Sequence, residues 1–341
     1  MTTRTEADTE AGERAGPPEV PRRLYADPGL PDRVFRGVAR SGGGLVLAVM
    51  LLVGGFLLYR AWQALSKAGW SFLTTETWEP DAGRFGIAAV IVGTVLIALV
   101  AIMVAVPLAV GGALYISEYA PARIRQTLIS VVDLMAAVPS VVYGLWGLFF
   151  FTSHVAGTAR WISTYFGWIP VFSVQGADPD DPLVNATVYA SSTLIAGMVV
   201  ALMVAPIVCS VMREVFSQAP VGEREGAYAL GATRWGMIRS VVLPFGKGGM
   251  IGGTMLGLGR ALGETIGVYL VISPIFAVQW HVLQSGTSSI SSLIALRYGE
   301  ASEFGMSALM AAGLALFLMT LVVNFAASSI VARSRSGASS E

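Results

Sequence analysis

Charged side chains are scarce in this sequence. Asp, Glu, Lys and Arg make up 13% of its 341 residues, whereas 54% of the residues are hydrophobic. Soluble domains usually carry about a quarter charged residues, so a lipid bilayer is the expected solvent for this chain. Positive and negative charges balance, and no basic patch with interleaved aromatic residues is present. The composition therefore gives no indication of nucleic-acid binding.

The residues of metal and nucleotide chemistry are also rare. The lone cysteine, Cys209, lies in an apolar run and is expected to be a small buried hydrophobic residue without a disulfide. The two histidines, His154 and His281, are far apart, so no metal site is predicted. A phosphate-binding loop is missing, since Gly246-Lys247-Gly248 lacks its leading glycine and its hydroxyl residue. We expect no catalytic residues and no cofactor in this chain.

Six stretches are long and apolar enough to cross a bilayer, which takes about 20 apolar residues each. They predict an all-α integral membrane protein with a transmembrane domain over residues 41–332. A disordered tail and entry segment at 1–40 precedes it, and a short tail at 333–341 follows. The predicted spans cover residues 43–65, 87–116, 127–151, 189–211, 250–272 and 306–331.

Lysine and arginine gather in alternate connections between these spans. With the N-terminus inside, 16 of the 22 Lys and Arg residues fall in inner segments, five fall in outer segments, and Arg260 lies within a span. Cytoplasmic loops carry such an excess, so both termini are predicted to be cytoplasmic. The segment 273–303 is too polar to span and is expected to re-enter partly or to lie on the outer surface.

The longest inner connection, residues 214–247, is predicted to be a helix-turn-helix. Good helix formers occupy 223–229, and Gly231 permits a tight turn. Thr233 is suited to cap a second helix, which we expect to end before Pro244. An apolar face at helical spacing is then formed by Trp235, Ile238 and Val242. An interfacial amphipathic helix without a partner is the alternative interpretation.

A charged pair interrupts the fifth predicted span. Arg260 and Glu264 are one helical turn apart and are expected to share a face. One interpretation is an internal ion pair that stabilises packing. The other is that Arg260 offers its donor fork to an oxyanion along a pathway while Glu264 orients the guanidinium.

The inner connection resembles the coupling motif of ABC importer permeases. That motif has a Glu-Ala-Ala triplet, a following glycine, and a hydrophobic-x-Leu-Pro close. The matching residues are Glu225, Gly226, Ala227, Gly231, Ala232, Val241, Leu243 and Pro244, where Gly226 departs from the usual alanine. The resemblance implies that this loop docks on a separate ATPase, which would hold the ATP and Mg.

Residues 30–332 also resemble the PstC-type permeases of phosphate importers. The similar motifs lie at 117–121, 138–148, 249–253 and 257–265. The resemblance implies a six-helix type I importer permease in the inner membrane, with a substrate pathway at Arg260, Glu264 and Thr265. It further implies a second permease of PstA type, a dimeric cytoplasmic ATPase, an extracytoplasmic phosphate-binding protein, and phosphate as the substrate.

Other functions compete with this hypothesis. A permease for sulfate or molybdate would carry the same arginine, because the binding protein performs most of the selection. An ATP-independent secondary carrier is a second alternative, but such carriers often contain inverted repeats, and none is evident here. A structural membrane scaffold would leave Arg260 without a purpose.

Overall fold

The computed structural model describes residues 29–176 and 186–335; the tail residues 1–28 and 336–341 lie outside them. The chain forms two compact units, Met1–Leu52 and Val53–Glu341. Its elements are α1 (Leu30–Ala68), α2 (Ser71–Thr74), β1 (Trp78–Glu79), β2 (Arg84–Phe85), α3 (Ala88–Leu114), η1 (Tyr115–Tyr119), α4 (Ala122–Ala137), α5 (Ser140–Trp146), η2 (Gly147–Phe151), α6 (Thr152–Phe166), η3 (Pro170–Phe172), η4 (Ala186–Val188), α7 (Thr193–Ser217), α8 (Val221–Ala229), α9 (Arg234–Met237), η5 (Ile238–Val242), α10 (Leu243–Gly263), α11 (Ile266–Val271), α12 (Ile290–Arg297), η6 (Tyr298–Glu300) and α13 (Glu303–Arg335).

The described part of the first unit is the beginning of α1. This helix starts at Leu30 and so takes in residues that were predicted to belong to the entry segment. Asp32 lies in the first turn, where a negative charge favours a helix, and it pairs with Arg36 at 3.1 Å. Every side chain from Leu30 to Leu52 is exposed within this chain. Exposed apolar side chains on a helix are stable in a bilayer, where lipid surrounds them.

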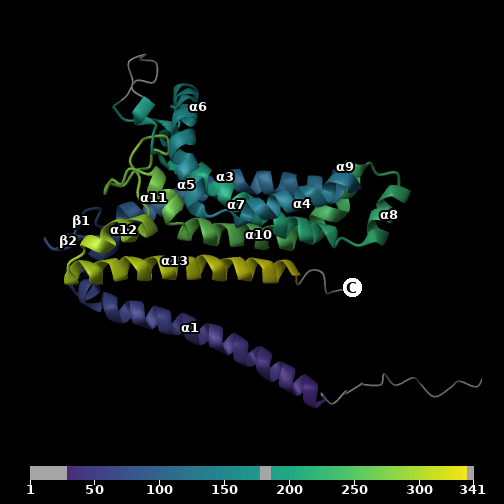
Figure 1. Ribbon diagram of the computed structural model, residues 1–341, viewed down its shortest axis with the longest axis horizontal. Coiled ribbons are helices and arrows are strands. Elements are labelled where there is room, and N and C mark those ends of the chain that lie inside the picture. The colour runs from purple at the N-terminus through teal and green to yellow at the C-terminus, as the bar shows by residue number, and fades with distance from the viewer. Residues whose placement is uncertain (1–28, 177–185, 336–341) are drawn as a thin grey trace, which may run out of the picture. The chain divides into compact units, whose positions relative to one another are not determined.

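The core of the second unit is formed by α3, α7 and α10 (Figure 1). Helices α3 and α7 pack along each other, α10 packs on both, and α13 packs on α10. One face of α3 carries small buried residues at spacings of three and four, which lets the two backbones approach closely. These residues are Ala98, Ala101, Ala105, Ala109 and Ala113.

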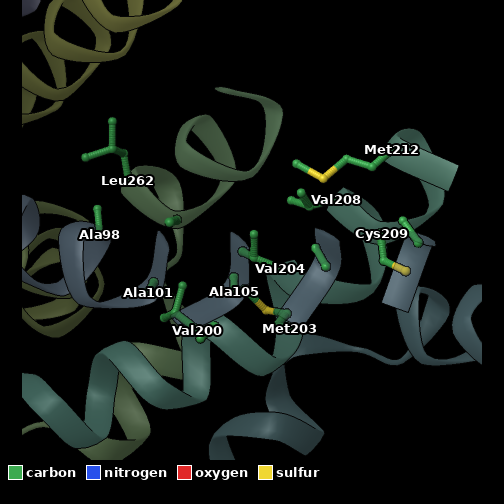
Figure 2. Close-up of a cluster of buried hydrophobic side chains, with 14 of the residues drawn as sticks. Ala98, Ala101, Ala105, Val200, Met203, Val204, Val208, Cys209, Met212 and Leu262 are labelled. Carbon is green, nitrogen blue, oxygen red and sulfur yellow. The ribbon is translucent and has the colours of Figure 1, made fainter. Parts of the chain in front are cut away.

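Figure 2 shows part of this core, where Ala101 and Ala105 of α3 lie among Val200, Val204 and Val208 of α7. Cys209 is buried and unbonded in the same cluster, as the sequence predicts.

Six helices of the described residues are long and apolar enough to cross a membrane, which confirms the predicted number and the all-α class. They are Leu30–Ala68, Ala88–Tyr119, Ser140–Phe166, Thr193–Ser217, Arg234–Gly263 and Glu303–Ala326. The second, fourth and sixth overlap the predicted spans closely, and the first contains its predicted span but starts earlier, whereas the third and the fifth differ.

The third helix does not run over residues 127–151 as predicted. Helix α4 ends at Ala137, because Val138 precedes a proline and adopts extended backbone with ψ 130°. A new helix starts after Pro139 and continues through α5, the π turn η2 and α6 to Phe166. The proline therefore separates two helices instead of bending one.

The fifth helix begins earlier and ends earlier than predicted. Pro244 does not end the second helix of the connection, because the π turn η5 ends two residues before it and the chain continues helically into α10. A π turn widens the backbone by one residue, and this accommodates the ring and the missing N–H of a proline. The far end is at Gly263, since Glu264 has extended backbone with ψ 128°.

The polar segment 273–303 is not confined to the surface. Thr287, Ser289 and Ser292 are buried. The Ile290 N–H donates to the Thr94 hydroxyl of α3 at 3.0 Å, and Ser289 and Ser292 form a capping box at the start of α12. Hydroxyl groups thus provide hydrogen-bond partners for backbone N–H groups of this segment where it lies against the helices.

Candidate functional site

The connection between α7 and α10 is the helix-turn-helix that the sequence predicts. Helix α8 ends in a left-handed turn at Gly231, whose φ is +81°. The Gly231 N–H donates to the Tyr228 carbonyl at 2.9 Å and the Ala232 N–H to the Ala227 carbonyl at 3.0 Å, which is a Schellman motif. Thr233 then caps α9 by accepting from the Gly236 N–H at 3.1 Å. These bonds define the turn between the two short helices of the loop.

The exposed surface of this loop carries large apolar side chains among charged ones. Its large uncovered side chains are Val221 (67% exposed), Tyr228 (44%), Leu230 (91%) and Trp235 (55%). Glu225 is exposed on the same short helix α8. The three residues of the predicted apolar face of the second helix do not share one environment: Ile238 and Val242 are buried, whereas Trp235 is exposed. A patch of this kind on a loop is typical of a surface that meets a partner.

The remaining motif residues lie where the loop joins the bundle. Ala227 and Leu243 are half-buried against the main core, and Pro244 is exposed in the first turn of α10. A methyl group added at Gly226 would meet no atom within 4 Å. The departure from the usual alanine therefore has no steric cause within this chain.

The inner face of α8 holds a contact that the sequence analysis missed. The Arg224 guanidinium lies 3.2 Å from the Glu118 carboxylate of η1, and it donates to the Phe216 carbonyl of α7 at 2.6 Å. The side chains are 20% and 5% exposed. The available signal was Glu118 itself, a carboxylate at the end of an apolar span and inside the motif Ser117–Pro121.

Arg260 lies in the last turn of α10, where a positive charge suits the helix dipole. Its side chain is exposed and lines a cavity of about 460 Å³. Two polar residues of α13, Thr320 and Asn324, line the same cavity, together with the apolar Ile207, Met255 and Leu256. Sequence reasoning missed both polar residues, because they belong to a different predicted span.

Of the two interpretations of this charged pair, the structure does not support the internal ion pair of Arg260 with Glu264. Within the described residues no ion pair joins them; α10 ends at Gly263, and the chain leaves the helix at the next residue, Glu264, which has ψ 128°. Glu264 is buried, and its carboxylate accepts from the Gly267 N–H in the first turn of the short helix α11 at 3.0 Å. The Thr265 hydroxyl donates to the Gly263 carbonyl at 3.3 Å. Both residues therefore shape the end of α10 and do not line the Arg260 cavity.

Six apolar helices around a core of small residues define a multi-pass membrane protein. The model of the family "binding-protein-dependent transport system inner membrane component" matches residues 105–336. The chain belongs to this family.

Its similarity to curated proteins extends over most of its length. It is 38% identical over 294 residues to the phosphate transport system permease protein PstC of Pasteurella multocida, which covers 85% of this chain and 88% of that protein. It is 37% identical over 304 residues to PstC 2 of Mycobacterium tuberculosis, covering 88% and 91%. The resemblance to PstC-type permeases is thereby confirmed.

The fold also matches a solved structure. A chain from the crystal structure of a bacterial ABC transporter involved in the import of the acidic polysaccharide alginate aligns with a TM-score of 0.51 at 18% identity. The match covers 88% of this chain and 99% of that one. The type I importer permease architecture is therefore confirmed.

Two glycines of the coupling motif are expected to respond differently to alanine. Gly231→Ala forces a side chain into left-handed backbone, which costs about 1–2 kcal/mol and corresponds to an increase of about 5- to 30-fold in loop opening. Gly226→Ala meets open space and should leave opening unchanged or reduced. Limited trypsin cleavage after the exposed Arg234 measures opening of the folded subunit. Equal cleavage rates in the two variants would contradict the assigned turn.

Proposed function

We propose that this chain is one permease subunit of an ATP-driven importer that translocates inorganic phosphate across the inner membrane. The observation that carries the proposal is similarity over most of the chain to proteins named as phosphate transport system permeases. Family membership supports transport in concert with a binding protein. The proposed substrate is phosphate, the anion in the name of these relatives.

The ATPase is proposed to be a separate cytoplasmic dimer, with the ATP and Mg bound there. The exposed outer face of the coupling loop, with Leu230 and Trp235 uncovered beside Glu225, supports a docked partner. A second permease of PstA type and an extracytoplasmic phosphate-binding protein complete the proposed assembly. The apolar first half of α1 and the cavity beside Arg260 are surfaces of this chain that the assembly or the bilayer would cover.

Arg260 is proposed to contact phosphate along the pathway. A guanidinium matches the oxygens of phosphate with a planar fork of donors, and it keeps its charge under all physiological conditions. The amide of Asn324 and the hydroxyl of Thr320 line the same cavity and add hydrogen-bonding groups. Glu264 has a supporting role in this proposal, because it ends α10 and so fixes the last turn that carries Arg260.

Both termini and the coupling loop are proposed to be cytoplasmic. The single native cysteine is buried, so the unaltered chain is a low-background control for thiol labelling. Leu230→Cys and Trp168→Cys place thiols at side chains that are 91% and 80% exposed. A membrane-impermeant maleimide added outside intact spheroplasts should label position 168 alone, and permeabilisation should add position 230. Labelling of both before permeabilisation would contradict the six-span orientation.

Phosphate uptake tests the substrate and the site together. In proteoliposomes with the whole complex, we expect ATP-dependent uptake of radiolabelled phosphate that excess sulfate and molybdate leave unchanged. Arg260→Gln removes the charge and should abolish most uptake; Arg260→Lys keeps the charge without the fork and should retain a fraction. Asn324→Asp should also reduce uptake, because it adds a negative charge to the cavity.

The outcomes of this experiment separate the two claims. Inhibition by sulfate or molybdate together with transport of that ion would assign the importer to another oxyanion. Normal phosphate uptake by assembled Arg260→Gln would refute the pathway role and leave Arg260 as a charge that stabilises the end of α10. Uptake that continues without ATP would favour a secondary carrier.

A further inference from the structure

We propose that Glu118 and Arg224 are positioning residues, which couple the loop to the helix bundle so that α8 and the end of α3 move as one unit. The inference rests on the proposed docking of an ATPase at this loop. It concerns the inner face of α8, which the coupling motif does not cover, because the motif residue Glu225 is exposed while its neighbour Arg224 is directed into the bundle.

One guanidinium joins three elements. Arg224 Nη1 donates to Glu118 Oε2 at 3.2 Å, and Nη2 lies 3.2 Å from Glu118 Oε1. The same Nη2 donates to the carbonyl of Phe216, a fully buried residue in the last turn of α7. Arg224 therefore fixes α8 to η1 and to α7 at once, and a displacement of α8 relative to either element breaks a contact of a charged group.

Burial makes this connection strong. Glu118 has only 5% of its side chain exposed, and its Oε1 atom makes no hydrogen bond within the described residues. The charge of Arg224 is thus the main interaction that offsets the loss of water around the buried Glu118 carboxylate. Removing either partner leaves the other charge in a poorly solvated place, which is far more costly than breaking an exposed ion pair.

The second helix of the loop, α9, contacts Tyr119, the residue of η1 that follows Glu118. The Arg234 guanidinium of α9 lies over the Tyr119 ring, 5.3 Å from its centroid. Adjacent residues of η1, Glu118 and Tyr119, therefore hold both short helices of the loop. Arginine over an aromatic face is an attractive arrangement, and it adds a contact on the other side of the Gly231 turn.

The element that carries these two residues is a π turn. Its Ala120 N–H donates to the Tyr115 carbonyl at 2.7 Å, which is the five-residue spacing of π-helix. As neighbours along a helical turn, Glu118 and Tyr119 point in different directions, and Glu118 is buried while Tyr119 is 41% exposed. A second π turn, η5, lies directly after α9. Such turns are rare and frequently occur at functional sites, so the loop joins the bundle at two of them.

The test compares variants in proteoliposomes that contain the complete complex, the ATPase and the binding protein. The quantity measured is the number of phosphate ions imported per ATP hydrolysed. Glu118→Gln and Arg224→Gln should keep hydrolysis and lower this ratio several-fold, because α8 moves without the bundle. The charge-swapped double variant, Glu118→Arg with Arg224→Glu, should recover part of the ratio. Glu79→Gln, which breaks an exposed ion pair with Arg84, is the matched control and should leave the ratio unchanged.

A purely structural role predicts a different pattern. If the single variants only lower the yield of assembled complex, and the assembled molecules import with the wild-type ratio, the proposal is overturned. Should neither glutamine variant assemble, Arg224→Lys decides the question. Lysine keeps the charge but has a single nitrogen to serve both Glu118 and Phe216, so the proposal requires a lowered ratio, and an unchanged ratio refutes it. A wild-type complex that hydrolyses ATP and imports no phosphate would contradict the proposed function instead.

Discussion

The contact between Arg224 and Glu118 determines how the exposed loop is attached to the membrane helices. Most of the loop surface faces outward, and Leu230 and Trp235 are uncovered within this chain. Without the ion pair, α8 would be held mainly by the chain on either side of it and by half-buried Ala227. A buried charge pair is a demanding connection, because each partner must remain with the other. That demand suits the role proposed for this loop, which is to transmit the movement of a docked ATPase without changing its own shape.

The helices that carry this attachment also pack against α10, the helix that carries Arg260. Helix α3 lies along α7 through its small residues, and α10 packs on both, so the three helices have little freedom to slide independently. Arg260 is carried at the opposite end of α10 from the loop, where Glu264 ends the helix. The loop and the lining of the Arg260 cavity are thus joined by one helix, because α10 begins directly after α9 and η5.

Local signals predicted the parts of the fold that local chemistry decides. Gly231 and Thr233 gave the turn and the cap of the loop, since a left-handed residue and a capping hydroxyl act within a few residues. Two expectations failed because of a neighbouring structural feature. The π turn η5 allows the helix to continue through Pro244, and the Glu264 carboxylate accepts from the Gly267 N–H of α11 instead of pairing with Arg260. The Glu118 contact with α8 joins residues far apart in sequence, and no periodicity reveals it.

The most direct measurement of the central claim is the distance between the Glu118 carboxylate and the Arg224 guanidinium in the assembled complex. It is obtained from two structures of the same complex, one without nucleotide and one with ATP bound. The account predicts that α8 changes position between them together with the end of α3, and that the two charged groups remain in contact at the 3.2 Å found here. Separation of the pair while α8 moves and α3 stays in place would contradict it.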